Sequence, residues 1–177
     1  MPQDEGWSLL IENHYPELGR VKKILRYATK KDTKFDKLKL ELFVNSLSQK
    51  YKLIRINQDY YCKCLEEEWS RDLVANYKNC EDYEQSGLGY LIVDGDKIIS
   101  GASSFSYYDV WIEIETDTHE AYRKQGSATV VAAELILSCL EQNLYPSWDA
   151  RNLASLYLAE KLGYTFSQEY IAYEVNW

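Results

Sequence analysis

A basic turn in the second half of the chain combines the residue types that bind an anion. The turn consists of Arg123, Lys124, Gln125, Gly126, Ser127 and Ala128. Ahead of it, Trp111 to Glu115 alternates apolar and acidic residues as a strand does, and behind it Ala128 to Leu140 is almost continuously apolar, as a buried helix is. The first turn of a helix leaves backbone N–H groups without partners and carries partial positive charge. This arrangement therefore predicts an anion-binding site.

The elements that position this turn follow a regular order. Before it, apolar runs at Tyr90 to Val93 and Lys97 to Tyr107 flank an Asp-Gly turn, which predicts a hairpin. After it, Tyr145 to Trp148 reads as a short strand, with Pro146 at its start or at a sheet edge. A helix over Leu153 to Leu162 follows, capped by Asp149 or Asn152 and ended by Gly163. Tyr164 to Phe166 and Tyr170 to Trp177 are expected to close the chain as a hairpin.

The first part of the chain reads as mainly helical. The sequence predicts helices, a single strand and a loop in this order: helices at Trp7 to Asn13, Val21 to Ala28 and Asp36 to Ser48, a strand at Tyr51 to Ile56, a helix at Cys62 to Asn76, and a loop at Tyr83 to Gly89. We therefore expect residues 1–80 to form a helical portion packed on a core formed by residues 81–177.

Composition and charge narrow the class of protein. A chain of 177 residues with 46% apolar residues suits one domain, and no apolar run is long enough to span a membrane. The net charge of −8 is uneven, because residues 1–55 carry 12 Lys and Arg against 7 Asp and Glu, whereas the remainder carries 8 against 21. This acidic remainder would repel a polyanion and favours a cationic substrate such as an amine. Nucleic acid and membrane are therefore not expected as partners.

The cysteines and histidines do not form a metal motif. Four cysteines and two histidines match no zinc spacing, and no metal cofactor is expected. Cys139 lies inside the apolar helix and reads as a core thiol. Nothing in the pattern requires disulfides, so a reducing cytoplasm is the expected location.

Two blocks resemble the GNAT acetyltransferase superfamily. The basic turn resembles its Arg/Gln-x-x-Gly-x-Gly/Ala signature, and Asn152 to Tyr164, ending in Glu-Lys-Leu-Gly-Tyr, resembles its second block. The resemblance implies a mixed α+β (α/β) GNAT fold, with a central, mostly antiparallel sheet that splays at the cofactor site and is flanked by helices. It also implies acetyl-CoA as co-substrate.

Within the superfamily, the chain is similar to the subgroup that includes zwittermicin A self-resistance acetyltransferases. The matching segments are Gly87 to Tyr90, Ser100 to Ser104, Glu113 to Thr118, Tyr122 to Gly126, Pro146 to Asp149, Asn152, Ser155, and Leu158 to Tyr164. The similarity is clear over about 80–177 and weaker back to about residue 5. Members of the subgroup carry a further segment ahead of this point, so the chain either lacks an N-terminal portion or is a compact member.

The resemblance assigns cofactor contacts. The turn from Arg123 to Ala128 would hold the pyrophosphate of acetyl-CoA through backbone N–H groups. Pantetheine would pair like an extra strand with the backbone of Glu115, Thr116, Asp117 and Thr118, since main-chain pairing asks little of side chains. Asn152 matches the superfamily asparagine that contacts the cofactor arm, although it is equally well explained as a helix cap. Ser155 is a candidate contact for the cofactor or its thiolate.

Acid and base are less well defined. Glu113 and Glu115 lie on one face of their strand, because side chains alternate with period two, and either carboxylate could take the proton of the amine. An exposed strand face is the alternative, and a loop histidine, His119, is a weaker candidate base. Many members have a tyrosine seven residues after the asparagine as acid, but Ala159 stands there. Tyr157 is about 200° around the helix from that position, so it is expected to point away.

The leading hypothesis is an N-acetyltransferase that transfers acetyl from acetyl-CoA to an amine of a small molecule, in a ternary complex. A non-catalytic acyl-CoA-binding or structural GNAT-like module is the alternative, motivated by Ala159. A nucleic-acid-binding protein that uses the basic N-terminal segment is a third reading, which conflicts with the overall charge. A homodimer is a further expectation.

Overall fold

The computed structural model describes residues 5–14 and 21–175. Its helices are α1 (Glu5–His14), α2 (Lys37–Asn45), α3 (Gln58–Glu66), α4 (Glu68–Arg71), α5 (Cys80–Ser86), α6 (Ser127–Glu141) and α7 (Leu153–Leu162), with the 3-10 turn η2 (Glu120–Tyr122). Its strands are β1 (Val21–Thr29), β2 (Lys52–Arg55), β3 (Gly89–Asp94), β4 (Lys97–Tyr108), β5 (Trp111–Thr118), β6 (Tyr145–Ser147), β7 (Asp149–Ala150) and β8 (Phe166–Val175). The α+β class is as predicted.

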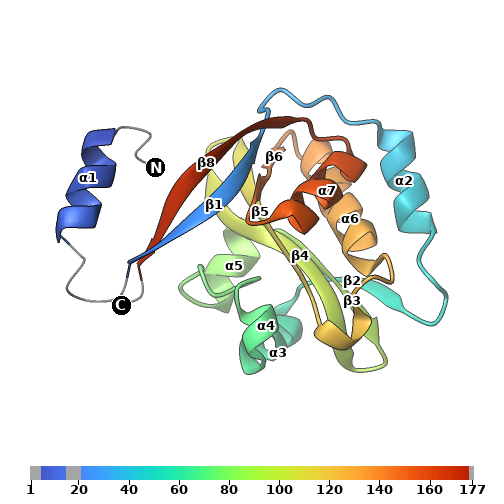
Figure 1. Ribbon diagram of the computed structural model, residues 1–177. Helices are drawn as coiled ribbons and strands as arrows, with labels where there is room; N and C mark the ends of the chain where they lie inside the picture. Colours follow the sequence, from blue (N-terminus) through green and yellow to red (C-terminus); the bar gives the residue numbers. More distant parts are fainter. Residues whose placement is uncertain (1–4, 15–20, 176–177) are drawn as a thin grey trace.

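The strands form two sheets (Figure 1). The larger has the order β2-β3-β4-β5-β6, antiparallel except that β5 and β6 are parallel. The smaller has the order β7-β1-β8 and is antiparallel. The chain changes from the larger sheet to the smaller at Trp148, between β6 and β7. This change of sheet opens the gap in which the candidate site lies.

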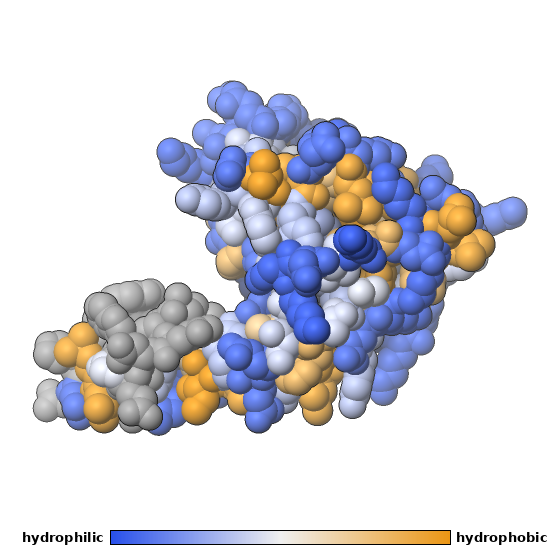
Figure 2. Space-filling model, turned by 90° about the horizontal axis from the view of Figure 1, so that it is seen from above, coloured by the Kyte–Doolittle hydropathy of each residue, from blue (hydrophilic) through white to orange (hydrophobic). Residues whose placement is uncertain are grey.

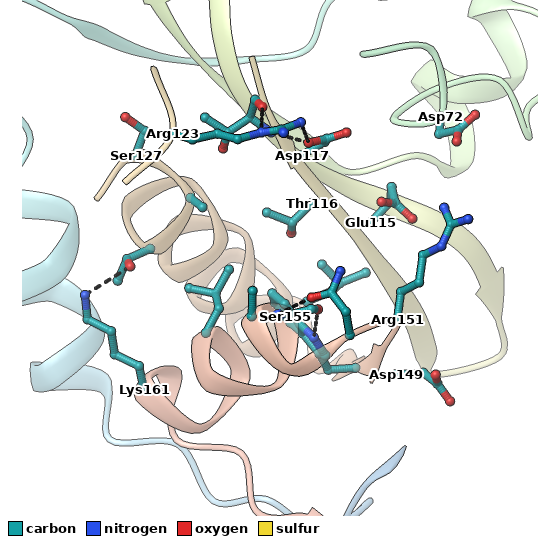
Figure 3. A pocket seen from close by; sticks show the side chains of 18 of the residues that line it. Asp72, Glu115, Thr116, Asp117, Arg123, Ser127, Asp149, Arg151, Ser155 and Lys161 are labelled. Atoms are coloured by element: carbon teal, nitrogen blue, oxygen red, sulfur yellow. Dashed lines mark hydrogen bonds and ion pairs between the residues drawn. The ribbon is translucent and has the colours of Figure 1, made fainter. Parts of the chain in front are cut away.

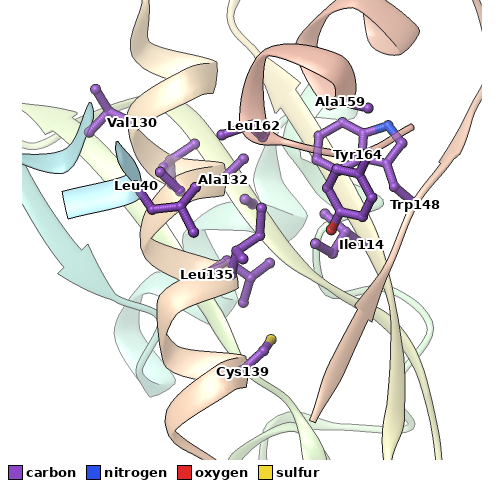
Figure 4. Packing of buried hydrophobic residues seen from close by; sticks show 14 of the residues in the cluster. Leu40, Ile114, Val130, Ala132, Leu135, Cys139, Trp148, Ala159, Leu162 and Tyr164 are labelled. Atoms are coloured by element: carbon purple, nitrogen blue, oxygen red, sulfur yellow. The ribbon is translucent and has the colours of Figure 1, made fainter. Parts of the chain in front are cut away.

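Helices cover both faces of the larger sheet. On one face, α6 packs between the sheet and α2 (Figure 1). Strand residues such as Ile99 and Ile112 join its core, and Figure 4 shows Ile114 of β5 in the same cluster. On the other face, α3, α4 and α5 pack over Leu91, Val93 and Ile98. The alternation of side chains along β3 and β4 thus supplies both cores at once.

Helix α6 is the central helix of the larger core. Ten of its residues are buried, as its apolar composition predicts, and Cys139 is a fully buried thiol. Burial of this thiol raises its pKa to about 12, so it stays protonated. The helix begins after Gly126, whose φ of 89° is a left-handed conformation that favours glycine.

The predicted helix at Val21 to Ala28 is wrong, because this segment is strand β1. It pairs along its whole length with β8, from Val21 opposite Val175 to Thr29 opposite Phe166. The predicted closing hairpin is wrong for the same reason, since β8 is one continuous strand next to β1. Its last predicted residues, 176–177, lie outside the described residues. Both segments are strands because each pairs with a segment far away in the sequence.

Two other predictions need correction. The expected single helix at Cys62 to Asn76 is two shorter helices, because Glu67 has extended backbone angles between α3 and α4. The expected loop at Tyr83 to Gly89 contains most of helix α5. The side chain of Asn79 caps that helix by accepting from the backbone N–H of Asp82 at 2.9 Å.

Local turn and cap signals are confirmed. Gly95 takes a left-handed φ of 61° in the β3–β4 hairpin. Asn152 caps α7, and Gly163 ends it with a φ of 115°. Pro146 lies in β6, which is an edge strand of the larger sheet. Helices α1 and α2 and strand β2 are also present, at the positions predicted from the sequence.

Residues on either side of position 80 share both sheets, because β2 pairs with β3 and β1 pairs with β8. The surface in Figure 2 is mainly hydrophilic, with hydrophobic side chains in separate patches. Among the described helices, none is both long and apolar enough to traverse a lipid bilayer.

Candidate functional site

A cleft of about 930 Å³ lies between β5, α6 and α7, where the two sheets separate. Eleven of the thirteen sequence-predicted site residues line it: Glu115, Thr116, Asp117, Thr118, Arg123, Lys124, Gly126, Ser127, Ala128, Asn152 and Ser155. The other two, Glu113 and Gln125, do not line the cleft. Gln125 is exposed and turns back, donating from Nε2 to the carbonyl of Ala121 at 3.4 Å.

The start of α6 presents donors to this cleft. The Gly126 carbonyl accepts from the N–H groups of Thr129 and Val130. Within the described residues, the N–H groups of Ser127 and Ala128 have no acceptor. A β-carbon built on Gly126 would meet nothing within 4 Å, so the open space next to the backbone is available to a ligand. Free N–H groups at a helix start suit a phosphate or another anion.

Cations surround the same end of the cleft. Arg123 donates from Nε to the Thr118 carbonyl at 3.0 Å and lies 3.8 Å from the Asp117 carboxylate. This anchoring holds the guanidinium beside the cleft wall (Figure 3). Lys161 of α7 donates to Thr129 Oγ1 of α6 at 3.2 Å. The sequence analysis gave Lys161 no role, although it lies in the second matched block. It follows Leu158 by three positions, so the two residues share one face of α7, and both line the cleft.

Strand β5 has an unpaired edge along the cleft. Strand β6 pairs with β5 only from Trp111 to Glu113, and beyond that point no described strand pairs with this edge. Thr116 points into the cleft, and its Oγ1 is buried without a hydrogen-bond partner (Figure 3). A buried polar atom without a partner is costly. The edge and this hydroxyl are therefore suited to an extended ligand that carries amide groups.

Glu115 is a carboxylate with an unusual environment. Burial, together with the nearby charges of Asp72 and Asp117, raises its pKa to about 7. Within the described residues, neither Glu115 nor Asp72 forms an ion pair. A carboxylate that titrates near neutral pH suits a general base. Of the two predicted glutamates, Glu115 is the one that lines the cleft.

Glu113 lies at the last β5–β6 pair, opposite Ser147. Burial raises its pKa, while the Ser147 hydroxyl and the Lys31 ammonium oppose the rise. Lys31 in turn donates to Ser147 Oγ. The Glu113 Oε1 atom is buried without a partner. The alternative of an exposed strand face therefore does not describe Glu113, which is half-buried at the point where the sheet splays.

The N-terminal turn of α7 forms another wall. The Asn152 side chain accepts from the Ser155 N–H at 2.9 Å, so it is a helix cap and a cleft residue at once. The Ser155 Oγ accepts from Nε1 of Trp148 at 3.1 Å. Trp148 is 3% exposed and also lines the cleft. Its position at the change of sheets was not singled out as a functional signal in the sequence.

Ala159 occupies the position at which many superfamily members have a tyrosine, and this position is not open to the cleft. Ala159 is fully buried beside Trp148 and Tyr164 (Figure 4). Tyr157 is 64% exposed and does not line the cleft, as predicted. His119 does not line the cleft either, and its Nδ1 accepts from the N–H of Ala121 at 3.2 Å.

Several cleft residues come from segments to which sequence reasoning gave no role. Arg26 of β1 pairs with Asp149 at 2.7 Å, and Arg151 pairs with Glu174 at 2.8 Å. Within each of these two ion pairs, the opposite charges largely cancel. Asp72 reaches the cleft from the segment after α4. Apart from Asp149, which ends the matching segment Pro146 to Asp149, no local motif marks these residues, because only the fold brings them together. In Figure 3, Asp72 and Glu115 lie at the opposite end of the cleft from Ser127 and Lys161.

Comparison with known proteins identifies the family and agrees with the fold. A profile of the GNAT acetyltransferase family matches residues 1–173. The crystal structure of a GCN5-related N-acetyltransferase-like protein from Streptococcus suis 89/1591 superimposes with a TM-score of 0.93. It is 49% identical in sequence, and the match covers 99% of this chain and 70% of that one.

One more distant structure agrees in fold, and one further relative is similar in sequence. A putative GNAT acetyltransferase from Novosphingobium aromaticivorans has a TM-score of 0.61 at 13% identity, covering 88% of this chain and 65% of that one. The uncharacterized N-acetyltransferase YdfB of Bacillus subtilis is 31% identical over 99 residues, which are 55% of this chain. The matched part spans only 38% of YdfB.

Proposed function

Because the chain belongs to the GNAT acetyltransferase family, we propose that it is an acetyl-CoA-dependent N-acetyltransferase that acts on an amine of a small molecule. The acetyl group passes by direct attack of the amine in a ternary complex. One observation carries the proposal: a single cleft joins a cationic helix start to a half-buried carboxylate, that of Glu115, through an unpaired strand edge. These are the groups that such a transfer needs, in the order in which the two substrates would use them.

The residues at the cationic end fit acetyl-CoA, which supplies an acetyl group activated as a thioester. The N–H groups of Ser127 and Ala128 would bind the pyrophosphate, with Arg123 and Lys124 adding charge. The free edge of β5 from Glu115 to Thr118 would pair with the amides of the pantetheine arm. The orphaned Thr116 hydroxyl supports this fit, because a polar ligand would satisfy it.

Glu115 would act as the general base. An amine similar to that of lysine is protonated at neutral pH, with a pKa of about 10, and must lose a proton before it attacks. The raised pKa of Glu115 makes its carboxylate a better proton acceptor than an exposed glutamate. Glu113 lies outside the cleft lining, so we assign it a supporting role at the splay.

The acceptor would enter from the acidic end of the cleft. Asp72 and Glu115 are not neutralised by an ion pair within the described residues, and they favour an ammonium group. A small amine is therefore the proposed partner rather than a nucleic acid or a membrane. Placement in the zwittermicin A resistance subgroup, a cytoplasmic location and a homodimer belong to the same proposal.

Turnover of amines tests the proposed function. The protein is incubated with acetyl-CoA and a panel of mono- and diamines, and release of CoA is followed together with the mass of the acetylated product. In parallel, calorimetry measures CoA binding by the same protein. We expect both binding and turnover. Binding without turnover on any amine would favour the non-catalytic acyl-CoA-binding alternative, and absence of binding would refute the site.

A further inference from the structure

A tryptophan fills the space beside Ala159, where many GNAT enzymes have a tyrosine. Trp148 and Ala159 are buried side by side, and the Trp148 ring lies 5.6 Å from that of Tyr164 (Figure 4). The indole N–H does not end in the core. It donates to Ser155 Oγ at 3.1 Å, and both residues line the cleft. The alanine therefore coincides with a different polar pair facing the cleft.

We propose that the Ser155 hydroxyl donates a hydrogen bond to the sulfur of the departing CoA, and that Trp148 is the positioning residue that orients this hydroxyl. The inference rests on the proposed function, since it assigns a further role within the same cleft. Ala159 cannot act as an acid, and the neutral Ser155 hydroxyl would serve the departing sulfur as a hydrogen-bond donor instead.

The hydrogen bonds around Ser155 leave its proton available. Its backbone N–H is held by the Asn152 side chain at 2.9 Å, which fixes the start of the helix. An indole nitrogen can only donate, so Ser155 Oγ must be the acceptor in its bond with Trp148. Within the described residues, nothing accepts the Ser155 hydroxyl proton. This proton is free to point into the cleft, and donation from the indole polarises it.

The tyrosines near the cleft are not better placed. Tyr122 lines the cleft, but its hydroxyl is 3.4 Å from Asp94 Oδ2, to which it donates. Tyr164 is buried and donates to the Pro146 carbonyl at 2.7 Å. Tyr157 is exposed on the other side of α7. Ser155 is therefore the hydroxyl of α7 that can meet a ligand in the cleft from the side opposite β5 (Figure 3).

The chemistry requires a hydrogen bond rather than proton transfer from serine. Glu115 takes one proton from the ammonium, and the freed amine nitrogen forms a bond to the acetyl carbon. The carbon–sulfur bond then breaks with its electron pair on sulfur, and the nitrogen loses its second proton to water as the amide forms. A thiol has a pKa of about 8.5, far below that of a serine hydroxyl, so serine cannot give up its proton to the thiolate. Ser155 instead stabilises the developing charge, as oxyanion-hole donors do. Water protonates the sulfur after release.

The decisive measurement is the pKa of the CoA thiol bound to the full chain, followed by thiolate absorbance during a pH titration. In the parent protein we expect it to lie about one pH unit or more below that of free CoA, a tenfold preference for thiolate. Ser155→Ala should return it to the free value and lower kcat about tenfold, with CoA affinity at about pH 6 unchanged. Ser155→Thr should restore both, because it keeps a hydroxyl.

Trp148→Phe tests the positioning role, because phenylalanine keeps an aromatic ring in the core but lacks the N–H donor. It should raise the bound thiol pKa toward the value in Ser155→Ala, whereas a merely structural role would leave that pKa unchanged. Tyr157→Phe is the matched control on the same helix and should not alter it.

The outcomes separate this inference from the proposed function. A parent protein that binds CoA without lowering its thiol pKa overturns the inference, even if a variant fails to fold. An unchanged bound pKa and kcat in folded Ser155→Ala also overturns it, while acetyl transfer by that variant leaves the proposed function intact. Failure of the parent to bind CoA removes both.

Discussion

Replacement of Glu115 by glutamine should stabilise the folded protein at alkaline pH while it removes the proposed base. In the folded chain, burial and the charges of Asp72 and Asp117 raise the pKa of Glu115 from 4.5 to about 7. The folded state therefore holds a proton that the unfolded chain has released, and stability contributed by Glu115 falls as pH rises between these two values. The penalty is complete above the folded pKa and absent below the unfolded one.

The size of the effect follows from the same values. At about 1.4 kcal/mol per pH unit, the interval from 4.5 to about 7 corresponds to roughly 3 kcal/mol. Glutamine carries no charge, but its buried amide costs part of this gain. We expect Glu115→Gln to raise the free energy of unfolding by about 1–3 kcal/mol near pH 8, and by much less near pH 4.5.

The assay is urea denaturation of the parent and Glu115→Gln at both pH values, with equal slopes required for comparison. Glu160→Gln is the control, because Glu160 is an exposed glutamate of α7. It should show no gain near pH 8. A variant that is less stable than the parent near pH 8, or a difference independent of pH, would refute the reasoning that the fold disfavours the Glu115 carboxylate.

Three other predictions concern the cleft. Gly126→Val should lower CoA affinity, measured by calorimetry, at least about tenfold, because valine is strained at a φ of 89° and fills the open approach to the helix start. Gly95→Val, also at a left-handed position but in a hairpin turn, should bind CoA as the parent does. Equal CoA affinity in the two variants would contradict the assignment of the pyrophosphate site. Glu115→Gln should lower kcat about 10²-fold and Glu113→Gln less, and full activity in both would move the base elsewhere. Tyr157→Phe should keep kcat within a few-fold, and a strong loss would mean that α7 is rotated.

Elements with a local signal could be predicted from the sequence. The turn at Gly95, the start of α6 after Gly126 and the end of α7 at Gly163 each need a left-handed residue, and glycine stands there. The class of fold followed from the order of these elements and from the resemblance. Helix α5 was missed although Asn79 is a good cap, because its apolar pattern is short.

Elements that depend on distant partners could not be predicted. Val21, Ile24, Leu25 and Ala28 have helical spacing, yet β1 lies between β7 and β8 and its polar backbone groups are satisfied there. A residue's preference for a strand depends mainly on its packing against neighbouring strands, which the local sequence does not contain. The closing strand β8 failed as a predicted hairpin for the same reason.

The candidate site divides along the same line. At its cationic end, the turn from Arg123 to Ala128 is contiguous in sequence, so one motif predicted it, whereas Lys161 reaches this end only through folding. Its acidic end is not, because Asp72 and Arg26 reach the cleft only through folding. The sequence also could not choose between Glu113 and Glu115, which share a strand face. The end of the β5–β6 pairing at Glu113 separates them, since it leaves Glu115 at the open edge.

A crystal structure of the full chain with CoA tests the central claim most directly. The account predicts the pyrophosphate on the N–H groups of Ser127 and Ala128, the pantetheine paired with the edge of β5 from Glu115 to Thr118, and the sulfur beside Ser155. CoA bound away from the start of α6, or bound there with its arm outside the gap between β5 and α7, would contradict it.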